Sequence, residues 1–280
     1  MSSVLAMKIS SITSICSCKR RDLSRPVQFG KVFDVRKLEH LYCPVCASTM
    51  FTKEQSREFC SDLADVTGED LVRTIEKYEN MNLDDNFAKD LPVFNPRQQE
   101  IIDRIKIAAL ENDDLYLDEL TDILGSEVAR KYSTFSTSKI TQSYTPTYHN
   151  SLPTLSDEDY ADVFFLNCRN RKFNSYEIAQ NFIKEKYPTI EHLIPVSRKG
   201  KNEDRNYMCD CSECNRNRGS MPFYLWAKQI PNFEENLQIQ IDQINRAIQE
   251  SKLDSIYSYY PKRLSKTIKY LSKGEIDLVV

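Results

Sequence analysis

Two CxxC cysteine pairs constrain this chain more than any other feature. Cys43-Pro-Val-Cys46 and Cys211-Ser-Glu-Cys214 each place two thiols on one tight turn. Four thiolates are enough to surround a tetrahedral Zn²⁺ ion. If all four bind one ion, the fold brings together segments that lie 164 residues apart, and the span between them is an insertion. We therefore predict a structural zinc site made of Cys43, Cys46, Cys211 and Cys214.

The remaining cysteines leave alternatives open. Nine cysteines in a chain without an export signal indicate a reducing compartment, where clustered cysteines are more often metal ligands than disulfides. Cys16, Cys18 and Cys209 are rival ligands, whereas Cys60 and Cys168 are expected to be ordinary buried thiols. A CxxC pair also suits a thiol redox protein, but the alternating βαβ context of such proteins is not evident here.

Charge is unevenly distributed along the chain. Residues 51–130 carry 20 acidic and 9 basic side chains, whereas residues 169–228 carry 12 basic and 7 acidic ones. A basic segment attracts a polyanion such as nucleic acid, and the acidic block predicts a surface that docks a protein or shields the site. Solvated helix faces are the alternative for that block. No run of 18 apolar residues occurs, so we expect no membrane contact and a cytoplasmic location.

The apolar spacing predicts mostly helical structure. A length of 280 residues suggests about two domains. The pattern is helical from 53 to 132, and Pro92 and Pro96 divide this region into two groups. Further expected elements are a helix around 175–186, two short strands flanking a loop at 200–204, and helices at 233–248 and 264–271. The predicted class is α+β, with a small β-turn-helix core in mostly helical surroundings.

A set of polar residues surrounds the second cysteine pair. Glu191 and Asn215 offer a carboxylate and an amide oxygen, which are hard ligands suited to Mg²⁺ or Mn²⁺. The imidazole of His192 suits a general base at neutral pH. Asn206 follows His192 by 14 residues and precedes Asn215 by 9. Phosphate-seeking cations lie around these groups, namely Arg198, Lys199, Arg216 and Arg218.

This polar set resembles the HNH endonuclease motif, in the version that has Asn as its third residue and that a four-cysteine zinc knuckle often braces. The positions that carry the resemblance are Glu191-His192, Asn206, Cys211-x-x-Cys214-Asn215 and Arg218-Gly219. The resemblance covers about residues 170–226 plus the first cysteine pair. It implies a ββα-metal fold, in which a hairpin and a helix hold one catalytic cation. Glu191 stands where Asp is commoner, and the insertion after Cys46 is unusually long.

The resemblance also implies a role for each residue. Glu191 and Asn215 would hold the catalytic Mg²⁺ or Mn²⁺, and His192 would take a proton from the attacking water. Asn206 would fix the hairpin loop and orient His192. The predicted function is therefore a metal-dependent endonuclease that cleaves nucleic acid, with DNA favoured over RNA. The alternative from another class is a non-catalytic zinc-knuckle module that binds nucleic acid or protein. The presence of Glu191, His192 and Asn215 disfavours this alternative.

The biological setting follows from a further resemblance. HNH subunits of two-gene phage-defence systems, of Septu type or associated with retrons, act together with an ATPase. This chain has no GxxxxGK[ST] loop, so an ATPase would be a separate subunit. A stand-alone phage or mobile-element endonuclease is the alternative.

We expect five segments along the chain. They are a basic N-terminal segment with the first CxxC pair at 1–50, an acidic helical insertion at 51–132, a Ser/Thr-rich linker at 133–156, an HNH core with the second CxxC pair at 157–228, and a helical region at 229–280.

Overall fold

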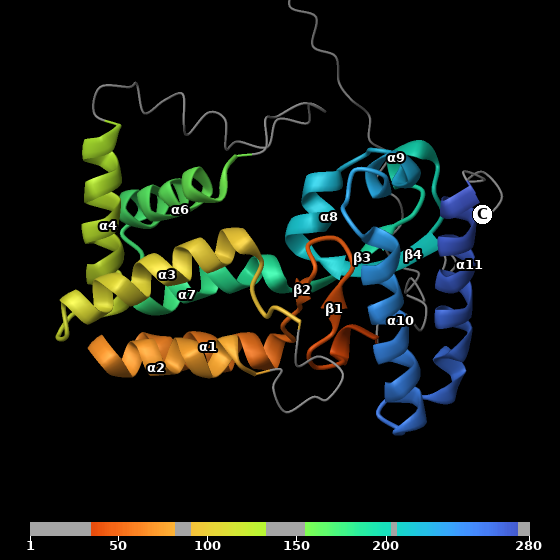
Figure 1. The fold of residues 1–280 in the computed structure, drawn as a ribbon, viewed down its shortest axis with the longest axis horizontal. Coiled ribbons are helices and arrows are strands. Elements are labelled where there is room, and N and C mark those ends of the chain that lie inside the picture. Colours follow the sequence, from red (N-terminus) through yellow and green to blue (C-terminus); the bar gives the residue numbers. More distant parts are fainter. Residues whose placement is uncertain (1–34, 82–90, 133–154, 203–205, 274–280) are drawn as a thin grey trace, which may run out of the picture.

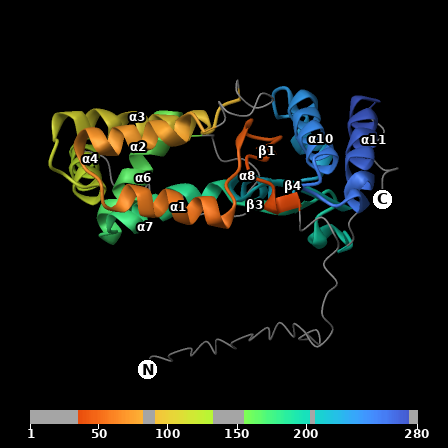
Figure 2. The same ribbon diagram turned by 90° about the horizontal axis from the view of Figure 1, so that it is seen from below.

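The computed structural model in Figure 1 describes residues 35–81, 91–132, 155–202 and 206–273. Cys16, Cys18 and nearly all of the predicted linker lie outside these ranges. In two perpendicular views, helices α1 to α7 form one group, and the strands with helices α8 to α11 form a second (Figures 1 and 2). The predicted α+β class is confirmed, with antiparallel two-stranded sheets in mostly helical surroundings.

The first group contains α1 (Lys53–Ala64), α2 (Gly68–Glu79), α3 (Pro96–Glu111), α4 (Leu117–Lys131), α6 (Asp157–Arg171) and α7 (Ser175–Ile183). Local sequence signals set several of the helix starts. Thr52 and Asn95 accept hydrogen bonds from the backbone three residues on, and a glutamine side chain completes a capping box in each case. Pro96 occupies the first turn of α3, so the predicted break at the two prolines is confirmed.

Helix α6 was not predicted from the sequence. Its residues from Tyr160 to Leu166 are all buried, so the segment has no polar face and no helical periodicity to detect. A start signal was nevertheless present, because Ser156 caps the helix and three acidic residues follow it. The predicted helix at 175–186 is α7 followed by a short 3-10 helix, η2 (Lys184–Lys186).

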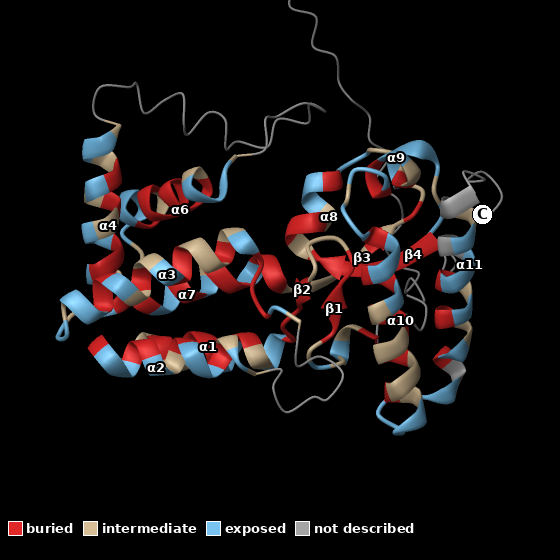
Figure 3. Cartoon of the chain, viewed as in Figure 1, coloured by how far each residue is buried: buried red, intermediate tan, exposed pale blue. Residues whose placement is uncertain are grey.

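The helices of this group have buried residues along their lengths (Figure 3), and these form a core that contains a cluster of aromatic side chains. Phe59, Phe94 and Phe182 pack with ring centroids 5.5 to 6.3 Å apart, within the range of favourable aromatic contacts. The core includes α6 and α7 together with α1 to α4, so it extends beyond the segment boundary that we predicted at residue 157. Cys60 and Cys168 are buried in it, as expected. Burial raises the pKa of Cys60 to about 11 and that of Cys168 to about 12, so both are neutral thiols.

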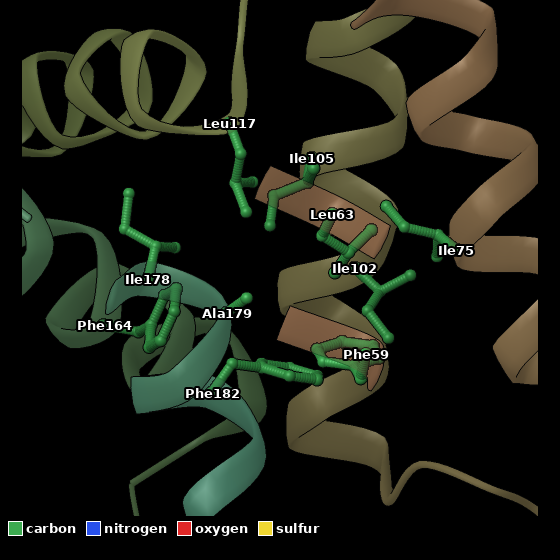
Figure 4. Close-up of a pocket in the computed structure, with 10 residues that line it drawn as sticks. All are labelled: Phe59, Leu63, Ile75, Ile102, Ile105, Leu117, Phe164, Ile178, Ala179 and Phe182. Atoms are coloured by element: carbon green, nitrogen blue, oxygen red, sulfur yellow. The ribbon is translucent and has the colours of Figure 1, made fainter. Parts of the chain in front are cut away.

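A small apolar cavity of about 20 Å³ lies in this core. Figure 4 shows that only aliphatic and aromatic side chains line it, including Ile102, Leu117 and Phe164. Ligand sites combine apolar walls with a few polar groups that orient the ligand. This cavity has no such group, and we interpret it as part of the core packing.

The second group is built around two small hairpins. β1 (Tyr42–Cys43) pairs with β2 (Ser48–Thr49), and β3 (Pro188–His192) pairs with β4 (Tyr207–Cys211). The other elements are η3 (Val196–Arg198), α8 (Ser212–Arg218), α9 (Phe223–Ala227), α10 (Phe233–Gln249), η5 (Ser255–Ser258) and α11 (Tyr259–Lys273). The predicted strands and the helix at 233–248 are confirmed, and the predicted helix at 264–271 begins earlier, at Tyr259.

Helices α10 and α11 hold the two hairpins together. The buried Gln240 of α10 donates from Nε2 to the carbonyl oxygen of Tyr42 in β1 at 2.7 Å and to that of Cys209 in β4 at 2.9 Å. Tyr260 of α11 accepts a hydrogen bond from the backbone N–H of Cys209 at 2.9 Å. These bonds satisfy backbone groups that a two-stranded sheet leaves unpaired at its edges.

The two groups share polar contacts at their junction. Chain continuity runs from α7 through η2 into β3, and the backbone N–H of Phe51 donates to the carbonyl oxygen of Lys186 at 3.2 Å. Glu213 of α8 lies 3.7 Å from Arg97 and accepts a hydrogen bond from Asn95, at the start of α3. No helix in the described ranges is long and apolar enough to cross a membrane.

We predict that Ile101→Ala lowers the free energy of unfolding by about 2 to 5 kcal/mol, because it leaves a cavity in the helical core. Ile101 is only 1% exposed. Ile107 of the same helix is 59% exposed, and Ile107→Ala should change stability by less than about 0.5 kcal/mol. Urea unfolding of both variants measures the difference. Equal losses in the two would contradict this packing of α3.

Candidate metal centres and active site

The hairpin β3–β4 and helix α8 form a continuous ββα unit. Strand pairing runs from Pro188 opposite Cys211 to His192 opposite Tyr207, and α8 begins directly after Cys211. Residues Thr189 and Glu191 therefore lie on the same face of the hairpin as Asp210, because side chains alternate along a strand. Asn215 of α8 hydrogen-bonds to β3, which places the helix against this hairpin.

The four predicted cysteines meet at one point. The Sγ atoms of Cys43, Cys46, Cys211 and Cys214 all lie within 4.8 Å of one another. The Cys46 and Cys211 sulfurs are 3.8 Å apart. Tetrahedral Zn–S bonds of about 2.3 Å would separate the sulfurs by about 3.8 Å, so the cluster has the right size for a metal ion. The rival Cys209 lies outside the cluster.

A buried lysine accompanies this cluster. Lys186 is fully buried, and its Nζ donates to Ser48 Oγ at 2.6 Å and to the carbonyl oxygen of Val93 at 2.7 Å. Ser48 Oγ lies 3.1 Å from Cys46 Sγ. Burial lowers the pKa of Lys186, while the nearby cysteine thiolates act in the opposite direction. A divalent metal with four thiolates would carry a net charge of about −2, which the Lys186 ammonium would partly compensate.

Glu191 is buried at the end of β3 and pairs with an arginine. Its Oε1 accepts a hydrogen bond from Arg218 of α8, whose guanidinium also donates to the carbonyl oxygens of His192, Leu193 and Met221. Burial raises the pKa of Glu191 to about 7, although Arg218 opposes this shift. Its Oε2 is buried and has no hydrogen-bond partner among the described residues. A buried carboxylate oxygen without a donor suits a cation ligand.

His192 lies half-buried beside Glu191 and is held by two neighbours. Its Nε2 is 2.9 Å from Asn202 Oδ1, and its ring contacts that of Tyr207 edge-on at 4.9 Å. Asn202 was missed in the sequence analysis, where the polar run around it indicated only a loop. Its distance from His192 in sequence gave no signal that the two side chains would meet.

Asn206 ties together the two ends of the loop that follows β3. Its fully buried side chain accepts from the N–H of Ile194 at 2.8 Å, and donates to the carbonyl oxygens of Ile194 at 2.9 Å and Lys201 at 3.0 Å. Gly200 makes this close packing possible, because a Cβ atom there would lie 1.8 Å from the Ile194 oxygen. Asn206 thus holds the loop that carries Asn202, whose side chain contacts His192.

The predicted nucleic-acid contacts divide into two kinds. Arg198 and Lys199 are exposed on the loop between the strands. Arg216 is about half exposed and pairs with Glu185 at 2.9 Å. Arg218, in contrast, is buried beneath Phe223 and Trp226. The expectation that Arg218 contacts nucleic acid does not fit this position, because its guanidinium is used to neutralise Glu191 and to bind backbone carbonyls.

Residues 179–221 match the model of the HNH endonuclease family. The chain contains an HNH endonuclease domain. The match runs from α7 to just beyond α8 and includes every motif position named above, but not the first cysteine pair. No curated protein and no solved structure matches the chain. An HNH domain indicates a nuclease-type function.

We predict that Lys186→Met makes the HNH domain lose the metal of its four-cysteine site faster. Without the buried ammonium, the negative charge of the thiolates has less compensation, and we expect release to a chelator to accelerate by about tenfold or more. Lys184→Met is the matched control, because Lys184 is an exposed lysine two residues away. Elemental analysis and chelator kinetics measure the effect. Equal release rates in the two variants would contradict the role of Lys186.

Proposed function

We propose that this chain is a metal-dependent endonuclease that hydrolyses phosphodiester bonds in nucleic acid. The observation that carries the proposal is the unsatisfied, buried Oε2 of Glu191, next to His192 in a ββα unit that matches the HNH family. An oxygen in this position fits a hard divalent cation, Mg²⁺ or Mn²⁺. Glu191 and the amide oxygen of Asn215 would hold that cation.

The cation would supply positive charge beside the scissile phosphate. His192 would remove the proton from the attacking water. Asn202 Oδ1 can only accept a hydrogen bond, so Nε2 of His192 donates to it and Nδ1 keeps its lone pair. We therefore assign Nδ1 as the basic atom. Asn206 would act indirectly, by holding the loop that positions Asn202.

Zinc is our proposed ion for the four-cysteine site. Thiolates favour Zn²⁺ over Mg²⁺, and a site with four protein ligands has no open position for substrate. Its role would be structural, since it joins the first cysteine pair to the start of α8. The metal would add to the apolar core of the second group, which includes Leu237, Ile241 and Leu264.

The substrate and partner proposals rest on resemblance. We propose DNA in preference to RNA, contacted by Arg198 and Lys199 on the exposed loop, with Arg216 available at the edge of α8. We also propose a role in phage defence together with a separate ATPase subunit. The acidic helical segment at 51–132 would dock that partner or shield the site. These proposals are tested by co-purification from the native host.

We predict that His192→Ala lowers the cleavage rate by at least about 10²-fold, the usual effect of removing a general base. The assay uses plasmid DNA, single-stranded DNA and structured RNA, with Mg²⁺, Mn²⁺ or EDTA. The control is His40→Asn, which changes the other described histidine and keeps a residue type that tolerates the positive φ of 56° found there.

Zinc content and melting temperature should be unchanged in His192→Ala, because His192 binds none of the thiolates. Full activity of this variant would refute the mechanism. If the wild-type protein binds nucleic acid but cleaves none of the substrates with either metal, the non-catalytic zinc-knuckle alternative holds.

A further inference from the structure

The amide of Asn215 can serve a cation only in one of its two orientations. Its Oδ1 is a ligand and its Nδ2 is not, although the two atoms have nearly the same size. A rotation of the amide by 180° would present the nitrogen where a ligand oxygen is needed. The surroundings of Asn215 therefore decide whether it can bind metal.

Two oxygen atoms of β3 receive the amide protons. Nδ2 of Asn215 donates to the carbonyl oxygen of Ile190 at 3.0 Å and to Oγ1 of Thr189 at 3.1 Å. The carbonyl oxygen can only accept. A hydroxyl group, however, can either accept or donate, so Thr189 alone would tolerate both orientations of the amide.

Asp210 removes this ambiguity. Thr189 Oγ1 lies 3.1 Å from the carbonyl oxygen of Asp210 and 3.2 Å from its Oδ1. The backbone carbonyl oxygen of Asp210 can only accept, so the hydroxyl proton points toward Asp210 and a lone pair of Oγ1 points toward Asn215. A rotated Asn215 would place its oxygen against two acceptor lone pairs, at the cost of two hydrogen bonds.

Asp210 is an unusual residue for its position. It is fully buried in β4, where its neighbours in sequence are Cys209 and Cys211. Its Oδ2 has no hydrogen-bond partner among the described residues. A buried carboxyl group with an unsatisfied oxygen destabilises a fold, and such groups tend to occur at functional sites.

We propose that Thr189 and Asp210 are positioning residues, which hold Asn215 with Oδ1 toward the catalytic cation. This inference rests on the proposed function, because it assigns Asn215 as a ligand. Thr189 and Asp210 are cross-strand partners, so the register of the hairpin puts the two groups together. The hydrogen-bond chain runs from Asn215 through Thr189 to Asp210, on the face of the hairpin that carries Glu191.

Mn²⁺ binding to the zinc-loaded protein without substrate, followed by electron paramagnetic resonance, tests this directly. Thr189→Val keeps the β-branched shape but removes the hydroxyl, and we expect Mn²⁺ affinity to fall about 10- to 100-fold. Thr189→Ser keeps the hydroxyl and should stay within about threefold of wild type. Asp210→Asn offers a donor to Thr189, weakens the constraint, and should give an affinity between those of wild type and Thr189→Val.

A rescue experiment separates orientation from a general structural effect. A carboxylate presents oxygen in both orientations, so Asn215→Asp should restore Mn²⁺ affinity when it is added to Thr189→Val. Thr189→Val with wild-type affinity, or a double variant that recovers none, would overturn the inference. Wild-type Mn²⁺ affinity in Asp210→Asn would show that Asp210 does not help to position Asn215. If the wild-type protein itself neither binds Mn²⁺ nor cleaves, the proposed function fails instead.

Discussion

The sulfur atoms of Cys43 and Cys46 lie against those of Cys211 and Cys214, and this contact joins two distant parts of the chain. Cys211 ends β4, and Cys214 lies within the first turn of α8, so the cluster sets where the helix leaves the hairpin. Asn215 is the next residue along. A metal ion bound by the cysteines would therefore position Asn215, the proposed ligand of the catalytic cation, without taking part in the reaction.

The two buried cations among the described residues each lie beside groups of opposite sign. Arg218 faces Glu191 at the active site, and Lys186 lies beside the cysteine cluster. An isolated buried charge is strongly unfavourable, so removing one member of such a pair would destabilise the fold by leaving the other charge without compensation. The guanidinium of Arg218 holds one oxygen of Glu191 and leaves the other available. In the proposed mechanism, this second oxygen is the one that binds the cation.

The helical group packs beside the HNH domain and is continuous with it. Helix α7 packs in the aromatic core and leads through η2 into β3, so the strand that ends in Glu191 and His192 begins at that core. At the junction, Glu213 of α8 pairs with Arg97 of α3. Glu185 of η2 pairs with Arg216 of α8. The long insertion thus contacts the ββα unit through Arg97 and Asn95.

From the two CxxC pairs the sequence predicted the four cysteines that meet in the cluster, and from the polar loop at 200–204 it predicted the hairpin. It indicated the set of Glu191, His192, Asn206 and Asn215 through their resemblance to the HNH motif. It did not predict α6, whose buried residues show no periodicity, and it assigned Arg218 to nucleic acid. Whether an arginine or lysine side chain is buried or exposed depends on contacts between segments far apart in sequence. Only the tertiary structure contains these contacts. The same holds for Asn202, Thr189, Asp210 and Lys186, which are ordinary polar residues until folding places them beside a ligand or a base.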